Sequence, residues 1–331
     1  MPSSAVHTFA DPDEYAAVFP ATSADLTITG RGQFIANVTR IDLHRLWMLR
    51  YSDNLPRVKH SANITGRTII AFRTQHGPGL FFNGKEMHSG NIKQLGPGQS
   101  DNQQSAGLAS VGVMSLPVED IASAGKAIAG IELEPPRDGL IVTPPTPAMA
   151  KLQRLHAAAA YLAESAPEII GHHEAARGLE QALIEAMVAC LTTADDAEDR
   201  AAQRRHASIM RRFRGALEEN DTQALYLPEL CKAIGVSGRT LRMCCQEHLG
   251  MSPKRHLLLR RMHLARRALR DGAPDMTTVT EIAARHGFWQ FGRFAGEYKL
   301  LFGEAPSATL HRPRSNGGAR RPLFGIFAKN E

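Results

Sequence analysis

Cysteine is scarce in this sequence, with 4 among 331 residues. The four thiols lack the paired C-x-x-C spacing of a zinc site, and they stand at Cys190, Cys231, Cys244 and Cys245. All four fall in segments with helical patterns, so we expect free, buried thiols. A redox switch through the adjacent Cys244 and Cys245 is the alternative.

Long apolar runs are also missing. No stretch approaches the roughly 18 apolar residues of a membrane span, and the first residues contain no basic segment followed by an apolar run. These absences predict a cytoplasmic protein. The 43% of hydrophobic and 22% of charged residues are ordinary for a soluble globular chain.

The usual signatures of catalysis do not occur. The segments Gly77-Pro78-Gly79 and Gly96-Pro97-Gly98 indicate turns and not a phosphate-binding loop. His44, His76 and His88 are the candidate metal ligands, but they lack H-x-H spacing followed by Glu, so we interpret them as loop or packed histidines. We therefore expect no catalytic residues, no metal and no cofactor.

Charge is distributed unevenly along the chain. Residues 1–200 contain 16 Lys and Arg against 22 Asp and Glu, whereas residues 201–331 contain 23 against 11. The first part has a net charge of −6 and the second of +12. This asymmetry predicts a polyanionic partner for the second part alone, because contacts with phosphates release condensed counterions. Charge by itself would equally suit RNA or a membrane surface.

The first part is typical of a β-domain. Between about residues 26 and 142, short apolar and β-branched runs alternate with clusters of Gly, Pro, Asn and Asp, as at 26–29, 33–38 and 67–72. This spacing predicts an antiparallel barrel or sandwich, with a helix only around 118–129.

A proline cluster marks the end of this β-domain. Pro144, Pro145 and Pro147 interrupt any regular element. Alanine-rich segments with helical apolar spacing follow at 148–162 and 175–191, which predicts two amphipathic helices.

The basic part begins with a helix-turn-helix pattern at residues 227–250. Apolar residues recur at helical spacing, at Leu230, Ile234, Val236, Leu241 and Leu249. Gly235 stands at the turn, where a residue without Cβ avoids the penalty of positive φ. Ser237 is suited to cap the second helix by accepting a backbone hydrogen bond.

The same pattern returns about fifty residues later, at 278–303. Gly287 takes the turn position, with Ile282 before it and Phe294 and Tyr298 after it. Between the two units, residues 253–269 form one continuous apolar stripe flanked by arginines, which predicts a single long helix joining them.

Taken together, residues from about 209 to 313 strongly resemble the DNA-binding domain of AraC/XylS-type transcription regulators. The marks of this resemblance are Gly235-Val236-Ser237, Arg239-Thr240-Leu241, Leu249-Gly250-Met251-Ser252-Pro253, Ile282-Ala283, Gly287-Phe288 and Phe302-Gly303-Glu304-Ala305-Pro306. The sequence departs from the family pattern at Met243, Cys245 and Ala305, where the family more often has an arginine, an aromatic residue and a Ser or Thr.

The resemblance implies that the second helix of each unit reads a major groove, with the two grooves about 34 Å apart. It assigns base reading to Arg239, Arg242, Met243, Gln290 and Arg293. It assigns phosphate contacts to Lys254, Arg255 and Lys299. The alternative for each cation is that it only solvates a helix surface.

The resulting prediction is a two-domain protein with a mostly β N-terminal part and an all-α C-terminal part. We expect a cupin-like effector-sensing domain (1–145), a helical dimerisation region (146–195), a linker (196–208), a tandem helix-turn-helix domain (209–313) and a flexible basic tail (314–331). The resemblance implies an activator that binds operator half-sites as a homodimer, responds to an unknown small molecule and works with RNA polymerase. The alternatives are a metal-dependent cupin-type enzyme fused to a DNA-binding domain and an effector-independent architectural DNA binder.

Overall fold

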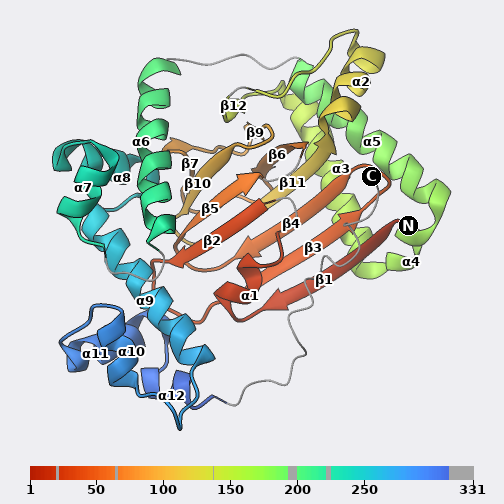
Figure 1. Cartoon of the computed structure of the whole chain (residues 1–331). Coiled ribbons are helices and arrows are strands. Elements are labelled where there is room, and N and C mark those ends of the chain that lie inside the picture. The colour runs from red at the N-terminus through yellow and green to blue at the C-terminus, as the bar shows by residue number, and fades with distance from the viewer. Residues whose placement is uncertain (20–21, 64–65, 137, 193–199, 221–224, 313–331) are drawn as a thin grey trace. The chain divides into compact units, whose positions relative to one another are not determined.

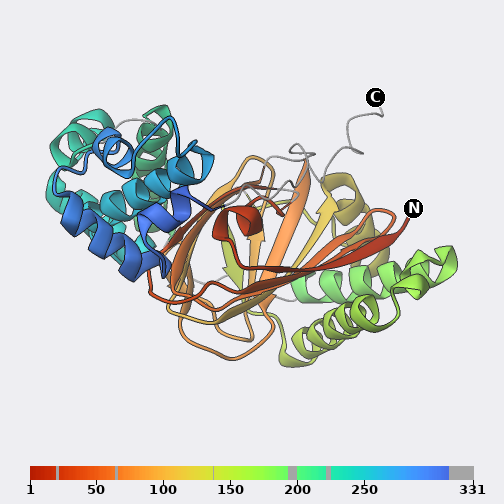
Figure 2. The same cartoon turned by 90° about the horizontal axis from the view of Figure 1, so that it is seen from below.

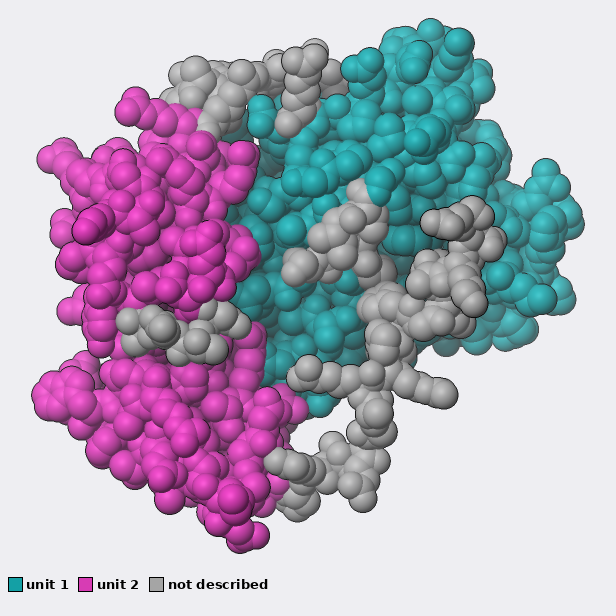
Figure 3. All heavy atoms as spheres, viewed as in Figure 1, with its two compact units in different colours: residues 1–26, 34–204 teal, residues 27–33, 205–331 magenta. Residues whose placement is uncertain are grey.

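The computed structural model describes residues 1–19, 22–63, 66–136, 138–192, 200–220 and 225–312, and the chain forms two compact units (Figures 1 and 3). Unit 1 comprises residues 1–26 and 34–204, and unit 2 comprises residues 27–33 and 205–331. The predicted tail (314–331) and residues 196–199 of the predicted linker lie outside the described residues. No helix in the described ranges is both long enough and apolar enough to cross a membrane.

Unit 1 contains two β-sheets, as the turn-punctuated pattern predicts. The larger sheet is antiparallel throughout, with the order β1 (Ser3–Phe9), β3 (Ala36–Asp42), β4 (Trp47–Asp53), β11 (Ala109–Pro117), β6 (Arg67–Arg73), β9 (Ile92–Leu95) and β12 (Leu140–Val142). The smaller sheet has the order β2 (Thr22–Ile28), β5 (Arg57–Asn63), β10 (Ser100–Ser105), β7 (Leu80–Phe82) and β8 (Lys85–Glu86).

Helices complete unit 1. The predicted helix at 118–129 is confirmed as α2 (Val118–Ala129), and the two alanine-rich segments form α3 (Thr146–Ser165) and α5 (His173–Thr192). Two short helices, α1 (Pro12–Ala16) and α4 (Pro167–Gly171), were not predicted. Figure 2 shows α3, α4 and α5 in green beside the larger sheet.

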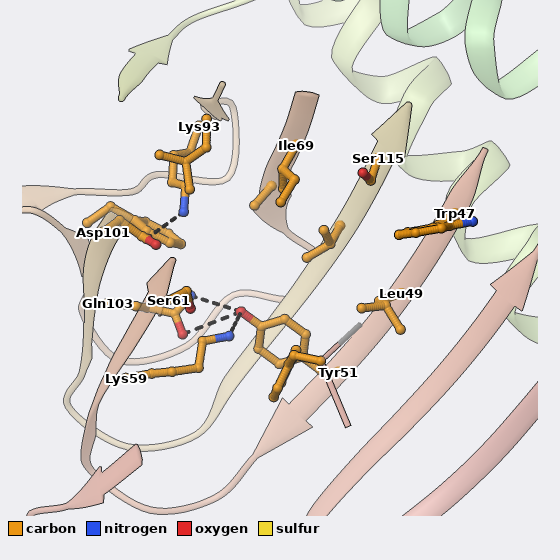
Figure 4. A pocket seen from close by; sticks show the side chains of 15 residues that line it. Trp47, Leu49, Tyr51, Lys59, Ser61, Ile69, Lys93, Asp101, Gln103 and Ser115 are labelled. Carbon is orange, nitrogen blue, oxygen red and sulfur yellow. Dashed lines mark hydrogen bonds and ion pairs between the residues drawn. The ribbon is translucent and has the colours of Figure 1, made fainter. Parts of the chain in front are cut away.

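The central strands of the larger sheet are buried on both faces. In β4, β6 and β11 the even-numbered side chains Met48, Ile70, Phe72, Met114 and Leu116 pack in one core cluster with residues of α2, α3 and α5. The odd-numbered side chains of these strands line a cavity on the opposite face (Figure 4). Successive side chains in a strand point to opposite faces. Each of these strands therefore contributes side chains both to the core beneath the helices and to the cavity on the other face.

Close packing fixes α3 on this sheet. His156 is fully buried, and its Nε2 lies 3.1 Å from the carbonyl oxygen of Leu49. A Cβ atom on Gly112 would lie 2.8 Å from both His156 Cε1 and Phe72 Cε2, so only glycine allows this approach. Burial lowers the pKa of His156 to about 4, which keeps the imidazole neutral at pH 7.

Unit 2 is helical, as predicted, and its first helix begins earlier than expected. Its helices are α6 (Arg200–Glu219), of which residues 200–204 are assigned to unit 1, α7 (Leu227–Ile234), α8 (Gly238–Leu249), α9 (Pro253–Asp271), α10 (Val279–Arg285), α11 (Phe291–Phe302) and α12 (Pro306–Leu310). Residues 200–208 of the expected linker are helical, because α6 is one amphipathic helix that buries Ile209, Met210 and Phe213. In Figure 1, α7 and α8 lie towards one end of α9, and α10, α11 and α12 lie towards the other.

Candidate nucleic-acid interface

The first helix-turn-helix unit has the predicted local geometry. Gly235 ends α7 in the left-handed region at φ 64°, where a side chain would be strained. Ser237 Oγ accepts a hydrogen bond of 3.1 Å from the backbone N–H of Thr240, which caps α8. The expected core residues Leu230 and Leu241 are buried, so the turn holds α8 firmly against α7.

The second unit has a similar glycine turn, but its side-chain cap lies on its first helix, α10. Thr278 and Glu281 form a reciprocal cap at the start of α10, with hydrogen bonds of 2.9 and 3.2 Å. Gly287 takes a positive φ of 75° at the turn. Phe294 and Tyr298 of α11, which follow Gly287 at helical spacing, are buried in the core of this unit.

An arginine from another helix supports the turn of each unit. Arg212 of α6 donates a hydrogen bond of 2.6 Å to the carbonyl oxygen of Ile234. Arg261 of α9 donates one of 3.3 Å to the carbonyl oxygen of Gly287, and its guanidinium lies 5.2 Å from the ring centroid of Phe288. These donors satisfy carbonyl groups at the ends of short helices and tie both turns to the longer helices.

All residues predicted to contact DNA are exposed. On α8 these are Arg239, Arg242 and Met243; at the start of α9 they are Lys254 and Arg255; around α11 they are Gln290, Arg293 and Lys299. The structure thus places the candidates in two main groups, one on α8 and one around α11. The two candidates for phosphate contacts, Lys254 and Arg255, lie in the first turn of α9.

Arg293 has an acidic partner on its own helix. Its Nε donates a hydrogen bond of 2.8 Å to the carboxylate of Glu297, one helical turn later. The arginine side chain is still 71% exposed. The carboxylate therefore holds the guanidinium at its Nε edge and leaves its outer edge open to solvent.

Two further exposed residues were missed. Gln246 follows Arg242 by one helical turn on α8, and Trp289 is 79% exposed directly before Gln290. The spacing of four residues from Arg242 was a sequence signal for Gln246. No sequence signal indicated that Trp289 is exposed, because an aromatic residue beside a helix-turn-helix core is more often buried.

The thiols of unit 2 are free. Cys244 and Cys245 are buried, and burial raises the pKa of Cys245 to about 12. A thiol that stays protonated is a poor nucleophile, so this environment does not favour the redox alternative.

The candidate metal ligands of unit 1 are dispersed. His44, His76 and His88 are all exposed, and the ring of His44 lies 4.7 Å from that of His173. In the part of the chain that the structure describes, no three His, Cys, Asp or Glu side chains are grouped so that they could hold a metal ion.

The fold and the two turns define a tandem helix-turn-helix protein, and comparisons with known proteins agree. A family model described as "Helix-turn-helix domain" matches residues 230–312. The chain is 45% identical over 94 residues to the probable thc operon regulatory protein of Rhodococcus erythropolis, a match covering 28% of each chain. It is 33% identical over 113 residues to the XylDLEGF operon transcriptional activator 2 of Pseudomonas putida, covering 34% of this chain and 72% of the relative.

Among solved structures, a probable AraC family transcriptional regulator from Rhodopseudomonas palustris CGA009 is 35% identical, with 31% of this chain and 95% of that chain covered and a TM-score of 0.29. The protein belongs to the AraC/XylS family of transcription regulators. The matches to the first curated relatives span less than a third of their length, 28% for the R. erythropolis protein and 29% for the XylDLEGF operon transcriptional activator 3 of P. putida.

Proposed function

We propose that this protein is a sequence-specific, DNA-binding transcription activator that works as a homodimer and responds to a small-molecule effector. The observation that carries the proposal is the repeated unit, a helix pair with a glycine of positive φ at its turn and cations exposed on its second helix, α8 in the first unit and α11 in the second. Two such helices joined by α9 match the requirement of reading two successive major grooves.

Within this proposal, base reading and phosphate binding are separate tasks. Arg239, Arg242 and Met243 of the first unit, with Gln290 and Arg293 of the second, face the base edges. Arginine suits guanine O6 and N7, glutamine suits adenine, and a methionine side chain offers an apolar contact to a thymine methyl group. Lys254, Arg255 and Lys299 contact phosphates, which positions the domain without selecting sequence.

The proposed sign of regulation is activation through RNA polymerase, by analogy with relatives named as transcriptional activators. Deletion of the gene should lower expression of a reporter driven from the native target promoter, and the full-length protein should restore it. A reporter whose expression rises on deletion would contradict activation while leaving DNA binding intact.

Dimerisation is proposed to use α3 in the helical region 146–195. Ala157, Ala158 and Tyr161 lie on one face of α3 at helical spacing, all three are exposed, and the tyrosine is 70% exposed. Small residues flanking an exposed aromatic allow two helices to approach closely, and the rings bury apolar area that is otherwise in water.

Tyr161→Glu should therefore shift the protein from dimer to monomer in sedimentation velocity. Burying an unpaired carboxylate should weaken the dimer by about 2 kcal/mol, or roughly 30-fold in its dissociation constant. Ile128→Glu is the matched control, because Ile128 is an exposed apolar residue on α2 (43% exposed) outside this face. A variant at Tyr161 that sediments like the control would contradict this interface.

A further inference from the structure

Two consecutive arginines lie near the middle of α9, the helix that runs between the two helix-turn-helix units (Figure 1). Arg260 donates a hydrogen bond of 2.7 Å to the carbonyl oxygen of Leu217, in the last turn of α6. Arg261 is half-buried, and its Nε is buried without a hydrogen-bond partner among the described residues. An unpaired buried donor is costly, so the position of Arg261 is not that of a side chain that only solvates the helix.

Arg261 contacts both units with one guanidinium. Towards the second unit, it donates the 3.3 Å hydrogen bond to the carbonyl oxygen of Gly287 and lies 5.2 Å from the ring centroid of Phe288. Towards the first unit, its Cζ lies 5.9 Å from the ring centroid of Tyr226, the residue directly before α7. A cation is attracted to an aromatic face within about 6 Å. Arg261 therefore links the start of the first unit to the turn of the second.

The residues at both ends of this link are themselves held in place. The backbone N–H of Tyr226 donates a hydrogen bond of 2.9 Å to the carboxylate of Glu229. The backbone N–H of Gly287 donates one of 2.9 Å to the carbonyl oxygen of Ala284. The ring of Phe288 packs 4.7 Å from that of Phe294 in the core of the second unit. The link thus connects two fixed local structures.

The core of the second unit is separate from the helices of the first. Leu259, Met262 and Leu269 of α9 pack in one cluster with Phe294 and Tyr298 of α11. Among the described residues, this cluster includes none from α7 or α8. Long helices bend, and α9 has 19 residues, so a contact that spans the junction restricts how the two units can rotate against each other.

We propose that Arg261 is a positioning residue that fixes the distance and rotation between the two reading helices, α8 and α11. This role rests on the proposed function, because only a protein that reads two grooves needs a fixed spacing. Inserting two base pairs between the two blocks of an operator moves the second block by about 7 Å and turns it by about 70° around the DNA axis. Units aligned before binding meet correctly spaced blocks at a high effective concentration and discriminate against shifted ones.

Fluorescence anisotropy of the full-length protein on three duplexes tests this role. The first duplex carries one half-site of the motif selected from random DNA by the unaltered protein. The second carries the same half-site with two base pairs inserted between the blocks, and the third has one block scrambled. The unaltered protein should bind the second and third duplexes about 10- to 100-fold more weakly than the first.

Arg261→Met keeps an unbranched side chain and removes the guanidinium. It should weaken binding at the selected spacing by about 10-fold, reduce the penalty for the insertion to below about 3-fold, and leave binding of the scrambled duplex within about 2-fold, because each unit still binds its own block. A merely structural role would weaken binding of all three duplexes in the same proportion. Thermal unfolding establishes that each variant is folded.

Two further variants complete the test. Arg285→Met removes an exposed arginine of α10 close to the same turn and should keep the full insertion penalty. Tyr226→Leu removes the aromatic ring at the other end of the link and should lower the penalty as Arg261→Met does; it carries the test alone if Arg261→Met does not fold. A full penalty in the folded variants, or proportional losses on all three duplexes, would overturn the inference while leaving two-groove reading intact. An unaltered protein indifferent to the insertion would overturn both.

Discussion

Replacing Arg293 with alanine should flatten the preference for one base pair of the operator and cost about 1 to 3 kcal/mol on the preferred sequence. Arg293 is the exposed cation nearest the start of α11, and Glu297 orients it through the 2.8 Å hydrogen bond to Nε. A guanidinium held in this way loses less side-chain entropy when it binds a base edge. Fluorescence anisotropy with operator duplexes carrying each base pair in turn measures the effect.

Lys299→Ala is the contrasting variant on the same helix. Its loss should be similar on all sequences, and the slope of log affinity against log salt should fall by about one, as expected when a single phosphate contact is removed. Equal, sequence-independent losses for the Arg293 and Lys299 variants would contradict the division between base reading and phosphate binding.

The second large effect is expected in unit 1, where Asp53→Ala should lower the free energy of unfolding by about 3 to 5 kcal/mol. Asp53 and Arg57 form an ion pair of 2.7 Å in which both side chains are fully buried. Asp53 also accepts a hydrogen bond of 3.1 Å from the hydroxyl of Tyr15. Removing the carboxylate leaves the Arg57 guanidinium without its counter-charge in the interior.

Chemical denaturation followed by circular dichroism measures this loss. The double variant Asp53→Leu with Arg57→Leu is the control, because replacing both charges by apolar groups removes the unpaired cation. We expect the double variant to be more stable than Asp53→Ala. A single variant as stable as the unaltered protein would show that the guanidinium finds another partner.

Much of unit 2 could be predicted because its signals are local. Gly235 and Gly287 stand where the chain needs positive φ, Ser237 caps α8, and the buried Leu241 and Tyr298 follow helical spacing. Each of these features depends on residues within a few positions of one another, so the sequence displays them directly.

The cavity could not be predicted in the same way. Lys59 and Gln103, which line it, are 44 positions apart in the sequence and meet only through the register of β5 against β10, which no local pattern reveals. The start of α6 was missed for another reason. The segment 200–208 is rich in arginine, which is typical of a linker, and only the burial of Phe213 further along α6 shows that this helix packs into a core.

The most direct test of the central claim is selection of bound sites from random DNA at fixed salt, using the full-length protein and the Tyr161→Glu variant. We expect one motif with two blocks of specified bases about one helical turn apart in both selections, and a doubled copy of that motif only with the unaltered protein. Failure to enrich any motif, or a motif with a single block, would contradict reading by two helix-turn-helix units.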